Sequence, residues 1–169
     1  MPLTINVNAY DTKSIDKAIK AIEKYGRQLE KKKKELCQRL ASIGAISVSL
    51  GFSQAFYDGP VDFHVSIESA NDGVFRVTAS GETVAFVEFG AGITYAGDGA
   101  HPKNSEFGTG PGTYPERKGH WNNPKGWWIP REKGGGRSSG NPAQMPVYRT
   151  AQELAKQVER IATEVFSHD

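Results

Sequence analysis

The chain has 169 residues, enough for one domain that buries a sizeable core. Its formal net charge of +2 gives no argument for nucleic acid as a partner. The single cysteine, Cys37, cannot close an internal disulfide, which excludes a disulfide-stabilised secreted scaffold. The N-terminus lacks the basic and apolar regions of a signal peptide, and no apolar run approaches the ~18 residues of a membrane span. We expect a soluble protein made in the cytoplasm, with no membrane partner.

Charge is distributed unevenly along the chain. Residues 11–40 carry ten Lys or Arg against five Asp or Glu, whereas residues 50–90 carry one against six. Opposite patches of this kind suit contact between subunits, or are two solvated faces. The run Lys31–Lys34 spans a full helical turn and so surrounds the helix, which predicts a solvated turn rather than a one-sided phosphate-binding stripe.

Residues 1–13 are expected to form an N-terminal arm. Within Leu3–Val7 apolar and polar residues alternate, as in a short strand or an extended segment. Asp11 and Ser14 both offer side-chain oxygens that can cap the helix predicted to follow.

A long helix is the first strongly periodic element. Its apolar residues recur in steps of three and four, which predicts a helix of about thirty residues; they are Ile15, Ile19, Ile22, Leu29, Leu36, Leu40 and Ile43. Gly44 is expected to end or bend this helix. Residues 45–56 fit both a strand and a helix, and we favour a kinked helical continuation.

Three short apolar segments separated by turn residues follow. Val61–Glu68 and Val74–Ser80 alternate as strands do, and Asn71–Gly73 between them suits a hairpin turn. Thr83–Phe89 is predicted as a third, buried strand that runs into the sharp exit Gly90–Gly92. These segments predict an antiparallel meander with one apolar face, covered by the long helix and a C-terminal helix. The expected fold class is α+β.

Residues 93–140 change character to glycine, proline and aromatic rings without a period. A stretch this long is usually functional or disordered, and we expect an extended flap that becomes ordered against neighbouring chains. Only Trp127–Pro130 resembles a strand in it. The last helix is predicted to begin near Pro146. The chain is thus expected to be one domain, with its packed core in 14–92 and 141–169.

Motifs for chemistry were sought without success. Gly108–Thr113 resembles a phosphate loop only superficially, because it lacks a preceding strand, a following helix and the Lys-Ser or Lys-Thr step. The histidines are not spaced as zinc ligands are; they are His64, His101, His120 and His168. We therefore predict no catalytic residue, no cofactor and no metal site.

Glu88 is the residue whose burial would be chemically unusual. On an exposed strand face it needs no partner, but a buried unpaired carboxylate costs several kcal/mol. If buried, it is expected to pair with a cation on the flap or on another subunit. The candidates are Arg76, Arg131 and Arg149.

Aromatic and basic residues alternate through 114–133. Single-stranded nucleic-acid binders use this combination for stacking and backbone contact, and protein interfaces use it for their strongest contacts. Because no nucleic-acid-binding fold is recognisable around it, protein contact is favoured, and a nucleic-acid-binding module is kept as the alternative.

With these residues laid out, the chain resembles the tail-completion (head–tail joining) family of long-tailed bacteriophages, also described as a minor tail component. The resemblance rests on the order of the elements, on a Tyr57–Gly59 turn, on Val87–Gly92 and on Asn141–Ala151, which opens the last helix. It covers most of the chain, with two departures. Ala91 stands where members often carry Thr, and the insertion at 93–140 is long.

The resemblance implies a non-enzymatic α+β virion subunit without cofactors. It would assemble as a hexameric ring at the head–tail junction, between head connector or adaptor proteins and the tail tube or tail terminator protein, near the DNA in the channel. The same resemblance places the protein in the host cytoplasm during assembly and in the virion afterwards. The residues predicted to contact neighbours are Glu88, Phe89, Tyr114, Trp121, Trp127, Trp128 and Arg131.

Overall fold

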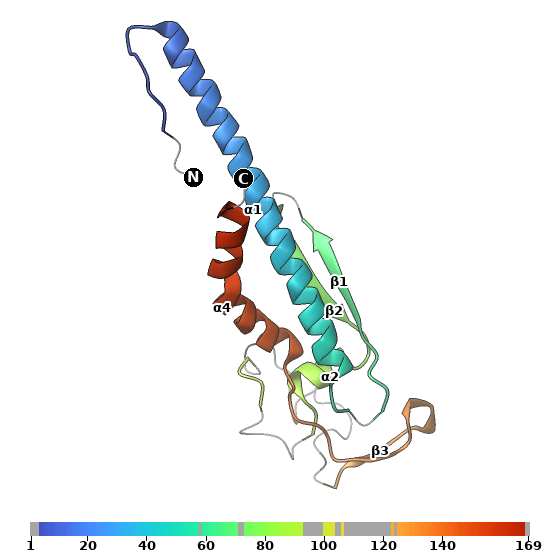
Figure 1. The fold of residues 1–169 in the computed structure, drawn as a ribbon. Coiled ribbons are helices and arrows are strands. Elements are labelled where there is room, and N and C mark those ends of the chain that lie inside the picture. The colour runs from blue at the N-terminus through green and yellow to red at the C-terminus, as the bar shows by residue number, and fades with distance from the viewer. Residues whose placement is uncertain are drawn as a thin grey trace.

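The computed structural model describes residues 4–57, 59–70, 73–92, 100–103, 106, 123 and 125–167. Within these ranges it has the mixed helical and strand content of an α+β protein, as predicted (Figure 1). None of the helices described there is both long and apolar enough to cross a membrane.

Helix α1 spans Thr12–Ser53, 42 residues, and is longer than the sequence pattern predicted. The carboxylate of Asp11 caps it by accepting from the N–H of Lys13 at 3.0 Å. The prediction that the helix continues past residue 45 is confirmed as far as Ser53, and the prediction that Gly44 could end it is wrong. Gly44 serves packing instead: a Cβ there would lie 3.1 Å from Cδ1 of Leu154, so its absence allows the C-terminal helix to approach closely.

The predicted hairpin is confirmed. Strands β1 (His64–Ser69) and β2 (Phe75–Ser80) pair antiparallel. Val65 lies opposite Ala79 and Ile67 opposite Val77, so the alternating apolar residues of the two strands share one face. The turn residues Asn71 and Asp72 lie outside the described part of the chain.

The predicted third strand is wrong, because Val84–Phe89 forms the short helix α2. A run of six mainly apolar residues fits both periods, so its sequence alone could not decide. In the helix, Val84 and Val87 stand one turn apart and both contact the core, and Val87 is fully buried. Gly90 ends the helix at a φ of 78°, a conformation that favours glycine.

Helix α1 lies between the hairpin and helix α4, which spans Pro146–Ser167 as the sequence predicted (Figure 1). Helix α4 packs on α1 and α2, so α1 is the helix that covers both strands. The buried centre consists of Val48, Phe52 and Val87, and the ring of Phe52 stacks on Phe63 at 5.5 Å.

Helix α4 runs antiparallel to α1 and covers only its C-terminal half. Pro146 at its start lies against Gly51, and near its end the carbonyl oxygen of Phe166 accepts from Nζ of Lys32 at 3.4 Å. The N-terminal half of α1 therefore extends beyond the body, as Figure 1 shows. Residues 4–11 turn back beside this half, where the N–H of Asn8 donates to Oγ of Ser14 at 2.9 Å (Figure 1).

Part of the predicted flap is a second small hairpin. The strand predicted around Trp127 is confirmed as β3 (Trp127–Ile129), which pairs antiparallel with β4 (Gly136–Ser138). The 3-10 turn η2 (Arg131–Lys133) lies between them. His101 is buried, with 4% exposure, so the segment predicted as a flap also contributes to the body.

Candidate interface around helix α2 and the Trp127 hairpin

The carboxylate of Glu88 holds the first turn of α4. It is buried, and it accepts from the N–H of Val147 at 2.8 Å and from the N–H of Tyr148 at 3.0 Å. These donors have no acceptor within the helix, and the positive end of the helix dipole also favours a carboxylate there. Glu88 therefore acts as a capping residue supplied by another helix.

His101 is the third partner of this carboxylate. Its Nε2 lies 3.2 Å from Oε1 of Glu88, and its Nδ1 accepts from the N–H of Lys103 at 3.0 Å. Because Nδ1 is an acceptor, the ring proton is on Nε2 and is donated to Glu88. The ring also lies between Phe89, at a centroid distance of 4.5 Å, and Tyr148, at 5.0 Å.

The prediction that a buried Glu88 would need a partner is confirmed, but the choice of an arginine is wrong. Arg76 instead lies 3.9 Å from Glu68, at the exposed end of the hairpin. Nothing in the spacing of the sequence pointed to His101, which follows α2 by a dozen residues in a segment without a period. The nearest signal was the general preference for a carboxylate at the start of a helix. A residue distant in sequence can satisfy this preference as well as a neighbouring one.

The two segments that carry the family resemblance interlock. Ala91 and Asn141 exchange backbone hydrogen bonds of 2.9 and 3.0 Å, and Nδ2 of Asn141 donates to the carbonyl of Phe86 at 2.8 Å. Gly140 has a φ of +101°, and a Cβ there would overlap the carbonyl of Ala91. The glycines of this clasp, which we define as residues 90–92 with 139–141, are therefore required by the close approach of two backbones.

Gln144 ties the clasp to the end of α1. Its N–H donates to the carbonyl of Val87 at 2.9 Å, and its Oε1 accepts from the N–H of Phe56 at 2.8 Å. Met145 follows at a φ of 58°, unusual for a residue other than glycine, and turns the chain into α4. The motif residues thus join α1, α2 and α4.

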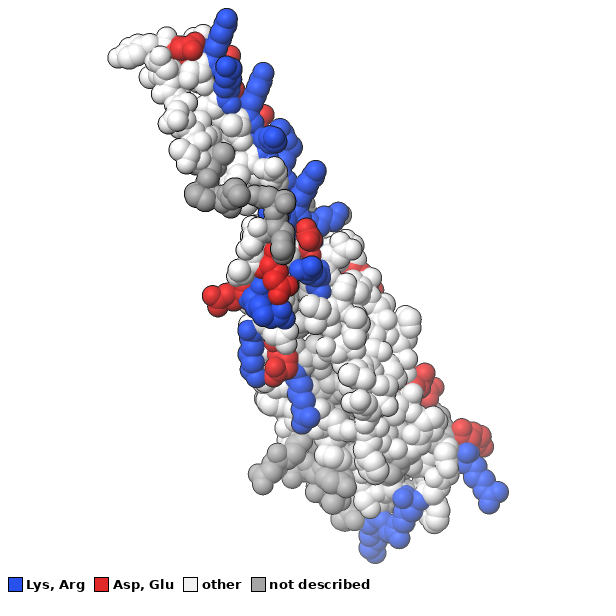
Figure 2. Space-filling model, viewed as in Figure 1, with Lys and Arg blue, Asp and Glu red and all other residues white. Residues whose placement is uncertain are grey.

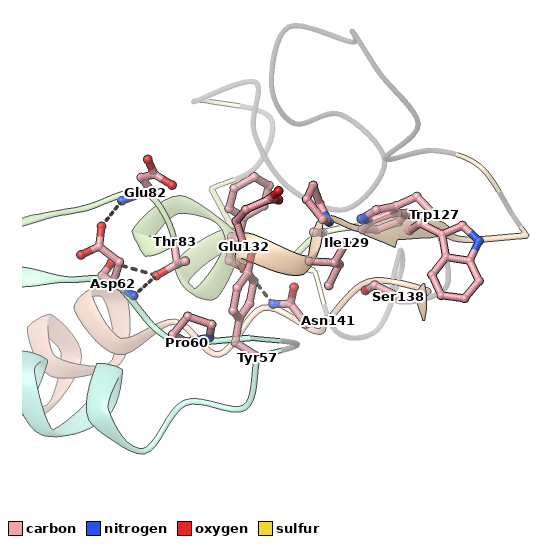
Figure 3. A pocket seen from close by; sticks show the side chains of 14 residues that line it. Tyr57, Pro60, Asp62, Glu82, Thr83, Trp127, Ile129, Glu132, Ser138 and Asn141 are labelled. Carbon is pink, nitrogen blue, oxygen red and sulfur yellow. Dashed lines mark hydrogen bonds between the residues drawn. The ribbon is translucent and has the colours of Figure 1, made fainter. Parts of the chain in front are cut away.

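A hollow of about 360 Å³ opens beside the clasp (Figure 3). Its walls are the segment from Tyr57 to Asp62, the start of α2, and the β3–β4 hairpin. The lining includes aromatic rings, prolines and carboxylates: Tyr57, Pro60, Asp62, Glu82, Phe86, Trp127, Trp128, Pro130 and Glu132. Figure 3 shows Tyr57 and Glu132 facing the same space from opposite walls, with Trp127 and Ile129 along the hairpin.

The residues predicted to contact neighbours fall into two groups. Glu88 and Phe89 belong to α2 and pack inside the chain, around His101. Trp127, Trp128 and Arg131 lie on the second hairpin, where Trp128 is 74% exposed. Tyr114 and Trp121, and half of the aromatic and basic segment 114–133, lie outside the described residues.

An exposed apolar stripe on α1 is a surface that the sequence did not identify as a site. The periodic apolar residues pack against the body where α4 covers them, and beyond the end of α4 they stay exposed. These are Ile15 at 37% exposure, Ile19 at 50%, Ile22 at 57% and Leu29 at 38%. We call this set the α1 stripe. The sequence predicted these residues as part of the periodic face of the helix. It did not show that α4 ends before reaching them and leaves them exposed.

The opposite face of the same half-helix is basic. Exposed Lys and Arg recur in steps of four and three along this half of α1. Most of them stand two positions before a periodic apolar residue, which places them about 200° around the helix from it. This basic row consists of Lys13, Lys17, Lys20, Lys24, Arg27, Lys31 and Lys34. Figure 2 shows these charges gathered along the half of α1 that extends beyond α4. Lys31 and Lys34, expected only as part of a solvated turn, therefore continue a one-sided row.

Within the described residues, no three His, Cys, Asp or Glu side chains are grouped closely enough to hold a metal ion. Comparison of this chain with protein-family models, with curated proteins and with solved structures finds no match. The bacteriophage resemblance thus stays a prediction from the motif residues themselves.

Proposed function

We propose that this chain is a structural subunit of a bacteriophage neck, assembling as a ring that joins the head connector to the tail tube. The resemblance supplies the phage assignment. The clasp supports this assignment, because the two segments on which the resemblance rests have a physical role. Val87–Gly92 and Asn141–Ala151 join the helices to one another.

The α1 stripe is the observation that carries the assembly part of the proposal. Fully burying an isoleucine or leucine side chain stabilises by roughly 1.5–3 kcal/mol, so four that are about half exposed offer roughly 3–5 kcal/mol. Association costs at least about 4 kcal/mol in lost freedom of motion. One such contact therefore gives little net affinity, whereas a closed ring holds each subunit on two sides.

The proposal is tested by the mass of the protein in solution, measured by light scattering, and by joining of heads to tails in phage extracts that lack the chain. We expect the wild type to form rings alone or with tail tubes, and to restore joining. Ile19→Ser with Ile22→Ser should remain helical by circular dichroism but fail in both assays. The matched control, Lys20→Ser with Lys24→Ser, changes the opposite face of the same two turns and should still form rings.

A wild-type protein that stays monomeric with tail tubes present, or an isoleucine variant that still forms rings, contradicts the proposal.

The basic row supports nucleic-acid binding as a second candidate function. It spans about 32 Å of helix at 1.5 Å per residue, long enough to follow several phosphates. In this candidate function the phosphates contact α1, which carries Lys31 and Lys34, and not only the segment 114–133. The test is the mobility of a DNA fragment with the protein at rising salt: phosphate contacts predict a steep loss of binding. Substituting the basic row should remove the shift, and the isoleucine variant should keep it.

A further inference from the structure

The hollow between Tyr57, α2 and the β3–β4 hairpin carries chemistry that the α1 stripe does not supply. Its volume of about 360 Å³ falls in the range of sites that take small ligands or a whole side chain with its backbone. Four aromatic side chains and two prolines line it, and among the described lining residues the charged ones are all acidic: Asp62, Glu82 and Glu132. Like charges around one hollow give a negative potential that attracts cations.

Two of these carboxylates are available to a ligand. The described part of the chain contains no ion pair of Asp62 or of Glu132. Asp62 is held in place, because its Oδ2 accepts from the N–H of Glu82 at 2.9 Å and its own N–H donates to Oγ1 of Thr83 at 2.8 Å. Glu132 belongs to the exposed turn η2 on the opposite wall (Figure 3). A cation between the walls would meet one carboxylate that already accepts a backbone hydrogen bond and a second one on an exposed turn.

The rings around the hollow suit the same class of ligand. Tyr57 and Phe86 stand 6.2 Å apart with tilted planes, and Trp127 lies along the hairpin wall. Aromatic faces attract ammonium and guanidinium groups, most strongly when water is excluded. They also pack on the aliphatic stems of lysine and arginine.

We propose that this hollow binds a lysine or arginine side chain presented by a partner protein chain. The stem lies between the rings and the prolines, and the cationic head meets Asp62 and Glu132. Arginine fits best, because its planar guanidinium stacks on rings and pairs with carboxylates at once. This site is tested separately from the α1 stripe, since the two share no residue. The basic row of a second copy supplies the side chain, because its charge is opposite to that of the hollow; a different protein is the alternative outcome of the test.

The test is an NMR titration of the full-length ¹⁵N-labelled protein with a short capped peptide, acetyl-Gly-Arg-Gly-amide. The matched probe carries citrulline, the neutral isostere of arginine. We expect the indole N–H resonance of Trp127, assigned with a Trp127→Phe variant, to shift saturably with the arginine peptide. Citrulline should bind at least tenfold more weakly. Glu132→Gln should weaken arginine binding several-fold, and the control Glu153→Gln, on an exposed face of α4, should leave it unchanged.

A second arm identifies the source of the side chain. If the basic row of another copy supplies it, the Trp127 resonance of the wild type also shifts with protein concentration, and Lys17→Gln with Lys24→Gln and Lys31→Gln abolishes that shift. If another protein supplies it, only the peptide moves the resonance. Equal binding of the two peptides, or no saturable shift with either, overturns the proposal and leaves the ring proposal standing.

Discussion

Removal of the Glu88 carboxylate tests the joint on which the body depends. In Glu88→Ala the N–H groups of Val147 and Tyr148 and the Nε2–H of His101 lose their acceptor together. Each buried donor left without a partner costs about 1–3 kcal/mol. Val147 is 38% exposed, so water replaces part of what is lost there. We expect a loss of about 2–4 kcal/mol, and about half of that for Glu88→Gln, which keeps one acceptor oxygen.

The assay is urea unfolding followed by circular dichroism, in which the midpoint falls and the slope stays constant if only stability changes. A loss of this size should lower the melting temperature by roughly 5–15 °C in a chain of this length. Glu153→Ala is the matched control: its carboxylate pairs with Lys156 at 2.7 Å on an exposed face, so its loss should be within about 0.5 kcal/mol. Equal effects of the two alanine substitutions would refute the role given to Glu88.

Three further predictions use the same unfolding measurement. Gly140→Ala should destabilise by more than about 2 kcal/mol, because its backbone has a positive φ and a Cβ would overlap Ala91, and an unchanged midpoint would count against the clasp. Gly26→Ala, in the open middle of α1 with nothing within 4 Å, should stabilise by about 0.5–1 kcal/mol and not destabilise. Phe52→Ala, fully buried, should cost about 3–5 kcal/mol, whereas Phe56→Ala, 64% exposed, should cost less than about 1 kcal/mol; similar losses would misplace the core.

The elements that the sequence predicted correctly are those set by local periodicity. The steps of three and four from Ile15 onwards predict α1, and the alternation in β1 and β2 predicts their hairpin, because each pattern is long enough to distinguish the two periods. Pro146 marks the start of α4 for a similarly local reason, its fixed φ and missing N–H. Such features need no knowledge of the rest of the chain.

The incorrect predictions all depend on distant parts of the chain. Helix α2 has only six residues, and its helical conformation is linked to partners elsewhere in the chain. Val87 packs in the core, and Glu88 accepts from the first turn of α4. The partner of Glu88 depends on the path that brings His101 back to α2. Gly44 was expected to end or bend α1, and its packing role could not be read locally because its neighbours, Leu154 and Val77, come from other elements. The sequence therefore predicted some residues of the candidate site, such as Glu88 and Trp127, but neither His101 nor the contacts that join them.

The two ends of the molecule give a physical reason for assembly. The half of α1 beyond α4 carries the apolar stripe on one face and the basic row on the other, and it packs on little else. The opposite end carries a hollow lined by rings and carboxylates (Figure 3). These surfaces differ in shape and in sign of charge, so each fits a partner unlike itself. Contacts between unlike surfaces of one chain are heterologous, and they close into a ring when the rotation between subunits allows it. A symmetric pair formed through the hollow, or through the basic row, would instead bring like charges together.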